Sequence, residues 1–398
     1  MNGKRKIVIA GGGIGGLAAA LGLARKDFSV VVLEQSRELG EIGAGIQIGP
    51  NAFHALDYLG VGEPARRRAV FIDRLVMMDS LDGRQVADIP VNEPFREYFG
   101  NPYAVIHRSD LHEVLLEACK RHPLVELVTS RRATGYEKIN GRVEVQVGDG
   151  ETLSADALVG ADGLNSCVRQ QMIGDGPPRV SGHVAYRALM PYDKMPEDLR
   201  WNAATLWAGP KTHLVHYPLK GWEVFNIVCV FHDETRTVPG ANVPGLRDEV
   251  MARFSHVCDK PMSILEALHD WRYWVLCDRD PIEHWVDGSV ALLGDAAHPM
   301  LQYFAQGACQ AMEDAVCLAH KIHSRGGDIE HGMLDYQAER VVRTARVQIS
   351  SRLIGEFLYH AEGVTRLVRN AMYSKREPEE WYRSLKWLYG GTGLDSTV

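Results

Sequence analysis

The chain has 398 residues, enough for two or three packed units. Hydrophobic residues make up 45% and charged residues 24%, which is typical of a globular protein and argues against a disordered or fibrous chain. The formal net charge of -7 argues against a nucleic-acid-binding protein.

The sequence also carries few signs of a targeting, membrane or metal-binding protein. No run approaches the ~18 apolar residues that a membrane span needs, and the N-terminus lacks the pattern of a signal peptide. The seven cysteines are scattered and form no C-x-x-C pair, which is typical of a reducing cytoplasm. His320 and His323 lie one helical turn apart without a third ligand nearby. We therefore expect a cytoplasmic protein without a metal site.

The first 34 residues predict a βαβ unit. Residues 6–10 (KIVIA) form a short apolar run, typical of a buried parallel strand, and a glycine-rich turn then leads into a helix over residues 17–25. A second strand, residues 29–33, ends at Glu34.

The turn of this unit carries the pattern Gly11-x-Gly13-x-x-Gly16. Glycines at these positions allow a tight turn and let the backbone approach a pyrophosphate, whose charge meets the helix N-terminus. Glu34 is placed to accept a hydrogen bond from a ribose hydroxyl. Since NAD- and FAD-binding proteins share this turn, it predicts a dinucleotide site without identifying the dinucleotide.

The rest of the chain predicts an α/β protein whose middle part has a different sequence pattern from the two ends. Ser109 or Asp110 would cap a helix that runs to about residue 122. Between about residues 180 and 277, aromatic-rich stretches of alternating apolar and polar residues predict an antiparallel sheet. The C-terminal part is predicted to be mostly helical. The predicted strands are residues 143–147, 156–160, 183–190, 212–218, 223–231 and 289–293, and the later helices are residues 307–325 and most of 332–388.

These elements predict a discontinuous Rossmann-like dinucleotide-binding domain into which an antiparallel-sheet lobe is inserted. The dinucleotide-binding domain would comprise residues 1–73, 100–179 and 277–330. The inserted lobe would comprise residues 74–99 and 180–276, and a C-terminal helical region would follow over residues 331–398.

The choice of FAD depends on two later segments, each with an aspartate at the end of a predicted strand. These are Asp162, within residues 160–169, and Asp295, within residues 294–299. Ligands of open α/β sheets bind at the carboxyl ends of the strands. With the glycine turn, the two segments resemble the motif set of group A FAD-dependent aromatic hydroxylases, the family of p-hydroxybenzoate and salicylate hydroxylases, over nearly the whole chain.

The resemblance identifies the discontinuous Rossmann-like domain as FAD-binding, with a non-covalent FAD, and the inserted antiparallel-sheet lobe as the substrate lobe. It also implies a transiently bound reduced nicotinamide nucleotide, for which NADH is expected and NADPH stays an alternative. Asp162 and Gly163 would contact the FAD pyrophosphate and the incoming nucleotide. Asp295 would hold a ribityl hydroxyl, and Arg108 would lie along the ribityl-phosphate chain.

The helix that begins near Gly307 would stabilise the reduced flavin. Its free amides at Gly307 and Ala308, together with the positive end of the helix dipole, would face the flavin ring.

The substrate pocket shows where the chain departs from the family. Gln302 and Ala305 stand where these hydroxylases usually carry Pro and Gly, and Gln302 resembles the subgroup of 3-hydroxybenzoate 6-hydroxylases. In the strand over residues 212–218, His213 and Tyr217 share one face because side chains alternate. We therefore expect His213, Tyr217 and Gln302 to line the substrate pocket as catalytic residues.

The expected chemistry explains these residue types. A phenol has a pKa near ~10, so about one molecule in a thousand is ionised at pH 7, and a base that lowers this pKa by two units supplies ~2.7 kcal/mol. His213 is the expected base. A phenolate oxygen directs hydroxylation of 3-hydroxybenzoate to carbon 6, giving 2,5-dihydroxybenzoate (gentisate). The sequence alone assigns no arginine to the carboxylate. Tyr217 and Gln302 could share it, and which group meets the phenol and which meets the carboxylate is left open.

Three alternatives stay open for function and two for the C-terminus. The enzyme could be a salicylate 1-hydroxylase or a hydroxynicotinate hydroxylase, and a non-enzymatic alternative is a flavin-binding redox sensor. The apolar set near the C-terminus would form part of a homodimer interface or a lid on its own subunit. That set is Trp381, Tyr382, Leu385, Trp387 and Leu388.

Overall fold

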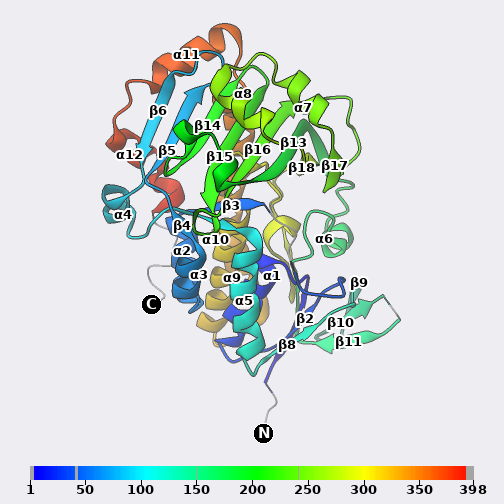
Figure 1. The fold of residues 1–398 in the computed structure, drawn as a ribbon. Helices are drawn as coiled ribbons and strands as arrows, with labels where there is room; N and C mark the ends of the chain where they lie inside the picture. Colours follow the sequence, from blue (N-terminus) through cyan, green and yellow to red (C-terminus); the bar gives the residue numbers. More distant parts are fainter. Residues whose placement is uncertain (1–3, 41–43, 149, 241, 391–398) are drawn as a thin grey trace.

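The structure is a computed structural model that describes residues 4–40, 44–148, 150–240 and 242–390. A mostly parallel sheet with its helices forms one half of the molecule, and a larger sheet forms the other half (Figure 1). Helices α11 (Gly363–Tyr373) and α12 (Pro378–Tyr389) pack along the outer edge of the larger sheet.

The first sheet has the strand order β19-β20-β12-β1-β2-β8, and its neighbours are parallel except β19 and β20. This order brings the three segments with the predicted cofactor motifs side by side, because each follows one of three neighbouring strands. The strands are β1 (Lys6–Ala10), β2 (Ser29–Leu33), β8 (Val125–Val128), β12 (Ala157–Gly160), β19 (Val286–Asp287) and β20 (Val290–Leu292).

Both faces of this sheet are covered, which explains its continuous apolar strands. Ile7, Ile9 and Val30 face a core shared with the helices, while Val8 and Val31 face a core shared with a small antiparallel sheet. The helices are α1 (Ile14–Ala24), α2 (Pro50–Tyr58), α3 (Gly62–Arg68), α5 (Arg108–Arg121), α9 (Gly307–Ser324) and α10 (Ile329–Ile354). The small sheet consists of β9 (Ala133–Ile139), β10 (Arg142–Val147) and β11 (Thr152–Ala155), with α6 (Cys167–Met172) beside it.

The larger sheet has the order β17-β18-β13-β16-β15-β14-β5-β6. It is antiparallel, as expected, except that β14 and β5 pair in parallel, because the β5–β6 hairpin arrives from an earlier segment of the chain. Helices α7 (Arg247–Arg253) and α8 (Asp259–Glu266) cover its outer face. The strands are β5 (Arg74–Asp79), β6 (Gln85–Pro90), β13 (Arg179–Pro191), β14 (Ala203–Gly209), β15 (Thr212–Leu219), β16 (Val224–His232), β17 (Val243–Gly245) and β18 (Trp271–Asp278).

A fourth sheet, which has three strands, connects the two halves. It consists of β3 (Gly45–Ile48), β7 (Ala104–His107) and β4 (Val70–Phe71), and helix α4 (Glu93–Phe99) packs against α12 nearby. The sheets thus show how the two halves are built from interleaved segments, while the exact domain boundaries stay a prediction.

One local prediction was wrong. Helix α5 begins at Arg108 without a side-chain cap, and the Ser109 hydroxyl is hydrogen-bonded to His107 Nδ1 at 2.6 Å. The C-terminal part is mostly helical, as predicted, and includes a π-helical turn, Gly355–Tyr359, between α10 and α11.

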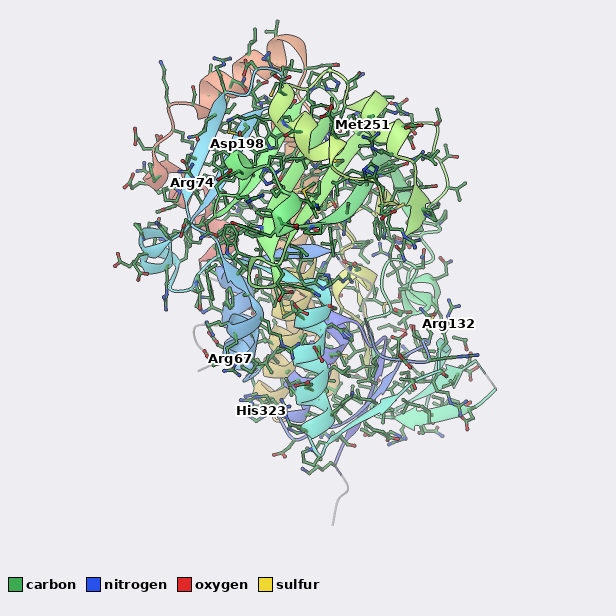
Figure 2. The ribbon with its side chains drawn as sticks, viewed as in Figure 1. Arg67, Arg74, Arg132, Asp198, Met251 and His323 are labelled. Atoms are coloured by element: carbon green, nitrogen blue, oxygen red, sulfur yellow. The ribbon has the colours of Figure 1, made fainter. Side chains whose placement is uncertain are left out.

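The apolar set near the C-terminus packs against its own subunit. Trp381, Tyr382 and Leu388 are buried in a core shared with α4 and β7. Among the described residues, none of the helices combines the length and hydropathy that a membrane-spanning segment requires. All seven cysteines are free thiols. His323, labelled in Figure 2, lies at the end of α9 far from the larger sheet.

Candidate active site

A cavity of about 500 Å³ lies where the carboxyl ends of β1, β12 and β20 meet the inner face of the larger sheet. Most of the exposed surface that lines it is apolar. Six predicted cofactor residues line it: Gly13, Arg108, Gly163, Asp295, Gly307 and Ala308.

The glycine turn between β1 and α1 is too close-packed for side chains at two positions. A Cβ on Gly16 would lie 2.0 Å from the Gly11 carbonyl oxygen, and one on Gly11 would lie 2.3 Å from the Ala161 carbonyl oxygen. Gly11 also has a φ of +106°, which only glycine adopts readily. Helix α1 begins after Gly13 with no side-chain cap, so its first amides are free for a phosphate.

Glu34 stabilises this turn from the end of β2. Its carboxylate accepts the Gly12 N–H at 2.9 Å and the Ser36 N–H at 2.8 Å. A carboxylate has about four acceptor positions, so two remain for the hydroxyls of a ribose.

The two carboxylate oxygens of Asp162 differ in their hydrogen bonding. Oδ2 accepts the Cys167 N–H at 2.8 Å at the start of α6, whereas Oδ1 is buried without a hydrogen-bond partner. The neighbouring Gly163 has a φ of +76° and open space where a Cβ would lie. An orphaned buried acceptor beside an open glycine fits a polar ligand, which the family resemblance identifies as FAD.

The loop after β20 is held from two sides by buried charges. Arg169 Nη1 donates to the Ala296 and Ala297 carbonyls at 3.1 and 2.7 Å. The Asp314 carboxylate accepts from the Gly294 amide at 3.1 Å and contacts His298. Although burial favours its neutral form, His298 and Arg340 hold the pKa of Asp314 at about 2, so it stays ionised. The loop is therefore rigid at the position where Asp295 enters the cavity.

Helix α9 presents its N-terminus to the cavity. It begins at Gly307 without a side-chain cap, and a Cβ on Gly307 would lie 3.8 Å from Asp295 Oδ1. Gln306, which precedes the helix, is held by Asn51 and Gln310 through hydrogen bonds to its Oε1 of 2.9 and 3.0 Å. The uncapped amides at Gly307 and Ala308 fit the anionic edge of a reduced flavin.

The predicted substrate residues lie together at the other end of the cavity. His213, Val215 and Tyr217 on β15 all line it, whereas Leu214 faces the core under α7 and α8, as the alternation predicts. Gln302 lines it from the 3-10 turn Gln302–Phe304.

The environments of His213 and Tyr217 change their ionisation. Burial, with a smaller contribution from His183 and His232, lowers the pKa of His213 well below its usual value, so the imidazole is neutral at pH 7. Burial also raises the pKa of Tyr217, and only the nearby Arg187 opposes this effect. The cavity therefore presents a neutral base and a neutral hydroxyl.

Arg187 is the residue that sequence reasoning missed. It lines the cavity from β13, its Nη2 donates to Gln302 Oε1 at 2.8 Å, and its guanidinium lies 5.1 Å from the Trp274 ring. Its Nε is buried without a partner, and no acidic side chain of the described residues forms an ion pair with it. Burial lowers its pKa, as expected for a cation that lacks a counter-ion.

A signal for Arg187 was present in the sequence. A lone arginine interrupts an apolar predicted strand at residues 183–190, on the same alternating face as His183 and Ala185. Which cavity that face lines became clear only from the pairing of β13 with β16.

Comparisons with known proteins agree over almost the full chain. The family described as FAD binding domain matches residues 4–350. The 3-hydroxybenzoate 6-hydroxylase 1 of Aquipseudomonas alcaligenes is 52% identical and covers 96% of this chain and 97% of its own. The 3-hydroxybenzoate 6-hydroxylase of Polaromonas naphthalenivorans (strain CJ2) is 51% identical over 96% of this chain and 95% of its own.

Solved structures share the fold. HpxO of Klebsiella pneumoniae, complexed with FAD and uric acid, superposes with a TM-score of 0.86 at 24% identity, over 98% of both chains. A salicylate hydroxylase substrate complex superposes with a TM-score of 0.84 at 26% identity, over 99% of this chain and 97% of the other.

Proposed function

The chain belongs to the family of FAD-binding aromatic monooxygenases, and on this premise we propose that it converts 3-hydroxybenzoate to 2,5-dihydroxybenzoate with NADH and O₂. The observation that carries the proposal is that one cavity holds both an arginine that forms no ion pair within the described part of the chain and a neutral histidine. These groups match a molecule that has one carboxylate and one phenol. The names of the relatives point to the same substrate.

FAD is the cofactor; when bound, it would take two electrons from NADH and use them to activate O₂, one atom of which enters the ring while the other leaves as water. We assign its pyrophosphate to the glycine turn, with Asp162 and Gly163 beside it. Glu34 would accept from the adenosine ribose. The ribityl chain would lie along Arg108 and Asp295, and the flavin ring would meet the amides of Gly307 and Ala308.

We assign the substrate carboxylate to Arg187. A guanidinium donates two parallel hydrogen bonds to a carboxylate, and such a pair is strongest where water is excluded. Because Arg187 already occupies the Gln302 carbonyl, the Gln302 Nε2 group remains as a second donor to the substrate. This assignment answers why a glutamine stands where the family usually has a proline: its carbonyl orients the arginine.

His213 is assigned as the base for the phenol, and Tyr217 as a hydrogen-bond partner on the same face. A neutral imidazole can accept the phenolic proton, and the phenolate directs oxygen to the para carbon. Because its own pKa is lowered, His213 would hold that proton only weakly.

Product analysis tests the proposed function. Purified protein with NADH, O₂ and 3-hydroxybenzoate should form gentisate, and the protein should lose its flavin completely on acid precipitation. Catechol and CO₂ from salicylate would instead indicate a salicylate 1-hydroxylase. NADH oxidation that 6-hydroxynicotinate stimulates would favour a 6-hydroxynicotinate 3-monooxygenase, the activity named for a relative from Bordetella bronchiseptica that is 31% identical. No NADH oxidation with any aromatic acid would favour a redox sensor.

We also propose a cytoplasmic homodimer. The seven free cysteines support the location. The dimer is supported by apolar side chains exposed on α11, such as Val364 and Leu367, rather than by the buried C-terminal set. Sedimentation that shows only a 44.3 kDa species at micromolar concentration would contradict the dimer.

A further inference from the structure

Four histidines gather at one end of the inner face of the larger sheet. They are His183 on β13, His213 on β15, His232 on β16 and His360 at the end of the π-helical turn. Neighbouring rings are in contact: the centroids of His183 and His232 lie 4.2 Å apart, and those of His213 and His360 lie 4.9 Å apart. The proposed catalytic step uses only His213.

Three of these histidines form a continuous hydrogen-bonded chain. His213 Nδ1 lies 2.7 Å from His360 Nε2, and His360 Nδ1 lies 2.9 Å from His232 Nε2. Because His213 uses Nδ1 in this chain, its Nε2 is the ring nitrogen left for the cavity.

The exposure of the imidazole rings increases from one end of this hydrogen-bonded chain to the other. His213 and His360 are 2% and 3% exposed, whereas His232 is partly open to solvent. The chain therefore leads from the substrate cavity, through an enclosed imidazole, to the protein surface.

The backbone fixes this arrangement. The Lys211 amide donates to the His360 carbonyl at 3.1 Å, and the His232 amide donates to the Lys211 carbonyl at 3.1 Å. The π-helical turn before His360 depends on Gly355, since a Cβ there would lie 2.6 Å from the Tyr303 ring. Single π-turns of this kind occur often at functional sites.

His183, His232 and His360 are also close enough together to suggest a metal site. The hydrogen bonds argue against this interpretation. Both nitrogens of His360 are already used within the chain. His183 bonds the Tyr303 hydroxyl at 2.6 Å through Nδ1 and lies 3.3 Å from Glu356 through Nε2. A metal ion would have to displace several of these bonds.

We propose that His213, His360 and His232 form a proton relay that carries the phenolic proton from the cavity to solvent. The relay rests on the proposed function, because it requires a phenol at His213.

The proton movements balance at every step. In the tautomer that the relay requires, His213 Nδ1 donates to His360, His360 Nδ1 donates to His232, and His232 Nδ1 carries the proton that is released to water. The phenol O–H bond breaks as His213 Nε2 gains the proton, each Nδ1 proton moves to the next Nε2, and water receives the last one. The three rings end neutral in the opposite tautomer, and the phenolate remains.

The lowered pKa values of the three imidazoles favour passing the phenolic proton on over retaining it on one ring. Burial lowers the pKa of both His213 and His360 well below its usual value, and the neighbouring histidines add to the effect. The pKa of His232 is lowered as well, mainly by burial, and Glu356 opposes this effect. No ring therefore retains the proton at pH 7. The other titratable groups around the cluster are Arg179, Lys211, Glu234, Glu356 and Glu362, with the hydroxyls of Tyr303 and Tyr359.

Proton release measured by stopped flow tests the relay. The holoenzyme is mixed with 3-hydroxybenzoate in weak buffer with a pH indicator, without NADH, and the absorbance of the phenolate is followed in parallel. His360→Gln keeps a polar side chain of similar reach but has no second ring nitrogen to pass a proton. We expect it to slow proton release at least about tenfold, with the FAD content unchanged.

Two further variants make the test specific. His232→Ala should slow release to a similar degree, and added imidazole should restore the rate because this position is open to solvent. His183→Gln is the matched control: it lies in the same cluster but outside the chain, so its release rate should equal that of the wild type. Chelator treatment should leave the wild-type rate unchanged.

Three results would overturn the relay: an unchanged rate in His360→Gln, equal slowing in His183→Gln, or a chelator-sensitive rate. Failure of the proposed function is distinguishable, because the wild type would then form no gentisate. If gentisate forms at the wild-type rate in both His360→Gln and His232→Ala, the relay alone is wrong.

Discussion

The two ends of the cavity are built in different ways. At the cofactor end, Asp162 accepts from an amide 5 positions away, Glu34 accepts from an amide 22 positions away, and the start of α9 offers its own backbone amides. At the substrate end, the hydrogen bond between Arg187 and Gln302 joins residues 115 positions apart, and that between His213 and His360 joins residues 147 apart. The motif residues of the first end thus act over short separations in sequence, although Arg169 and Asn51 hold its loops from distant segments. The contacts of the second end depend on how the sheet and the C-terminal helices assemble.

The largest expected effect is at the cofactor end. Gly16→Ala should abolish FAD retention and lower the free energy of unfolding by about 3 kcal/mol or more, because the new Cβ meets a backbone carbonyl that cannot move aside. FAD content and thermal unfolding would measure this. Gly307→Ala is the control for folding, since its Cβ makes only an ordinary 3.8 Å contact. Wild-type stability in Gly16→Ala would mean that the turn is looser than its geometry indicates.

Loss of the proposed base should affect turnover and leave FAD binding intact. His213→Ala should lower kcat at pH 7 by about 10²- to 10⁴-fold, and the rate should recover toward pH 9.5 as hydroxide ionises the phenol. Gln302→Pro should lose turnover without this recovery, since pH does not restore a hydrogen bond. Because the pKa of His213 lies well below its usual value, the wild type should lose no activity through His213 between pH 9.5 and 6.

The measurement is kcat with 3-hydroxybenzoate between pH 6 and 9.5, with gentisate and peroxide counted separately. Identical pH profiles for His213→Ala and Gln302→Pro would contradict the different roles of the two residues.

Arg187 should govern affinity. Arg187→Gln should raise the KM for 3-hydroxybenzoate about 10- to 100-fold, the effect of losing a charged hydrogen bond. The KM for 3-hydroxybenzamide, which has no carboxylate, should change little. Arg187→Lys keeps the charge but not the planar pair of donors, so its KM for 3-hydroxybenzoate should lie between those of the wild type and Arg187→Gln. An equal rise for acid and amide would place the carboxylate elsewhere.

These contrasts also explain what the sequence could predict. The strand-turn-helix of residues 6–25 and the shared face of His213 and Tyr217 follow from local periodicity, and the structure has both. Arg187 and His360 could not be assigned from the sequence. Their roles depend on the register of β13 with β16 and on a π-helical turn, neither of which follows from local preferences.

Stability toward acid should depend on the larger sheet, where buried histidines concentrate. Burial lowers the pKa of His216 to about 3, and both of its ring nitrogens lack partners. Below about pH 6.5 the unfolded chain binds a proton that the folded chain does not, so the free energy of unfolding falls with pH by about 1.4 kcal/mol per unit for such a histidine.

His216→Leu should remove this contribution and flatten the dependence between pH 6 and 5, as measured by denaturant unfolding. Since His216 faces away from the cavity, turnover should change little. A slope equal to that of the wild type would mean that His216 is protonated in the folded state.

The smallest expected effect concerns Ala305, which stands where the family usually has glycine. Its φ of +52° and ψ of 38° are left-handed, which costs a residue with a Cβ about 1 kcal/mol. Ala305→Gly removes this strain but adds freedom to the unfolded chain, so the net gain in unfolding free energy should stay below about 1 kcal/mol. Ser130→Gly is the matched comparison, because Ser130 is exposed and has a φ of 56°. If Ala305→Gly gains less than Ser130→Gly, the Ala305 methyl group contributes favourable packing against the cavity. If Ala305→Gly gains more unfolding free energy than Ser130→Gly, the alanine lowers the stability of the fold. Its methyl group would then be retained because it shapes the substrate site.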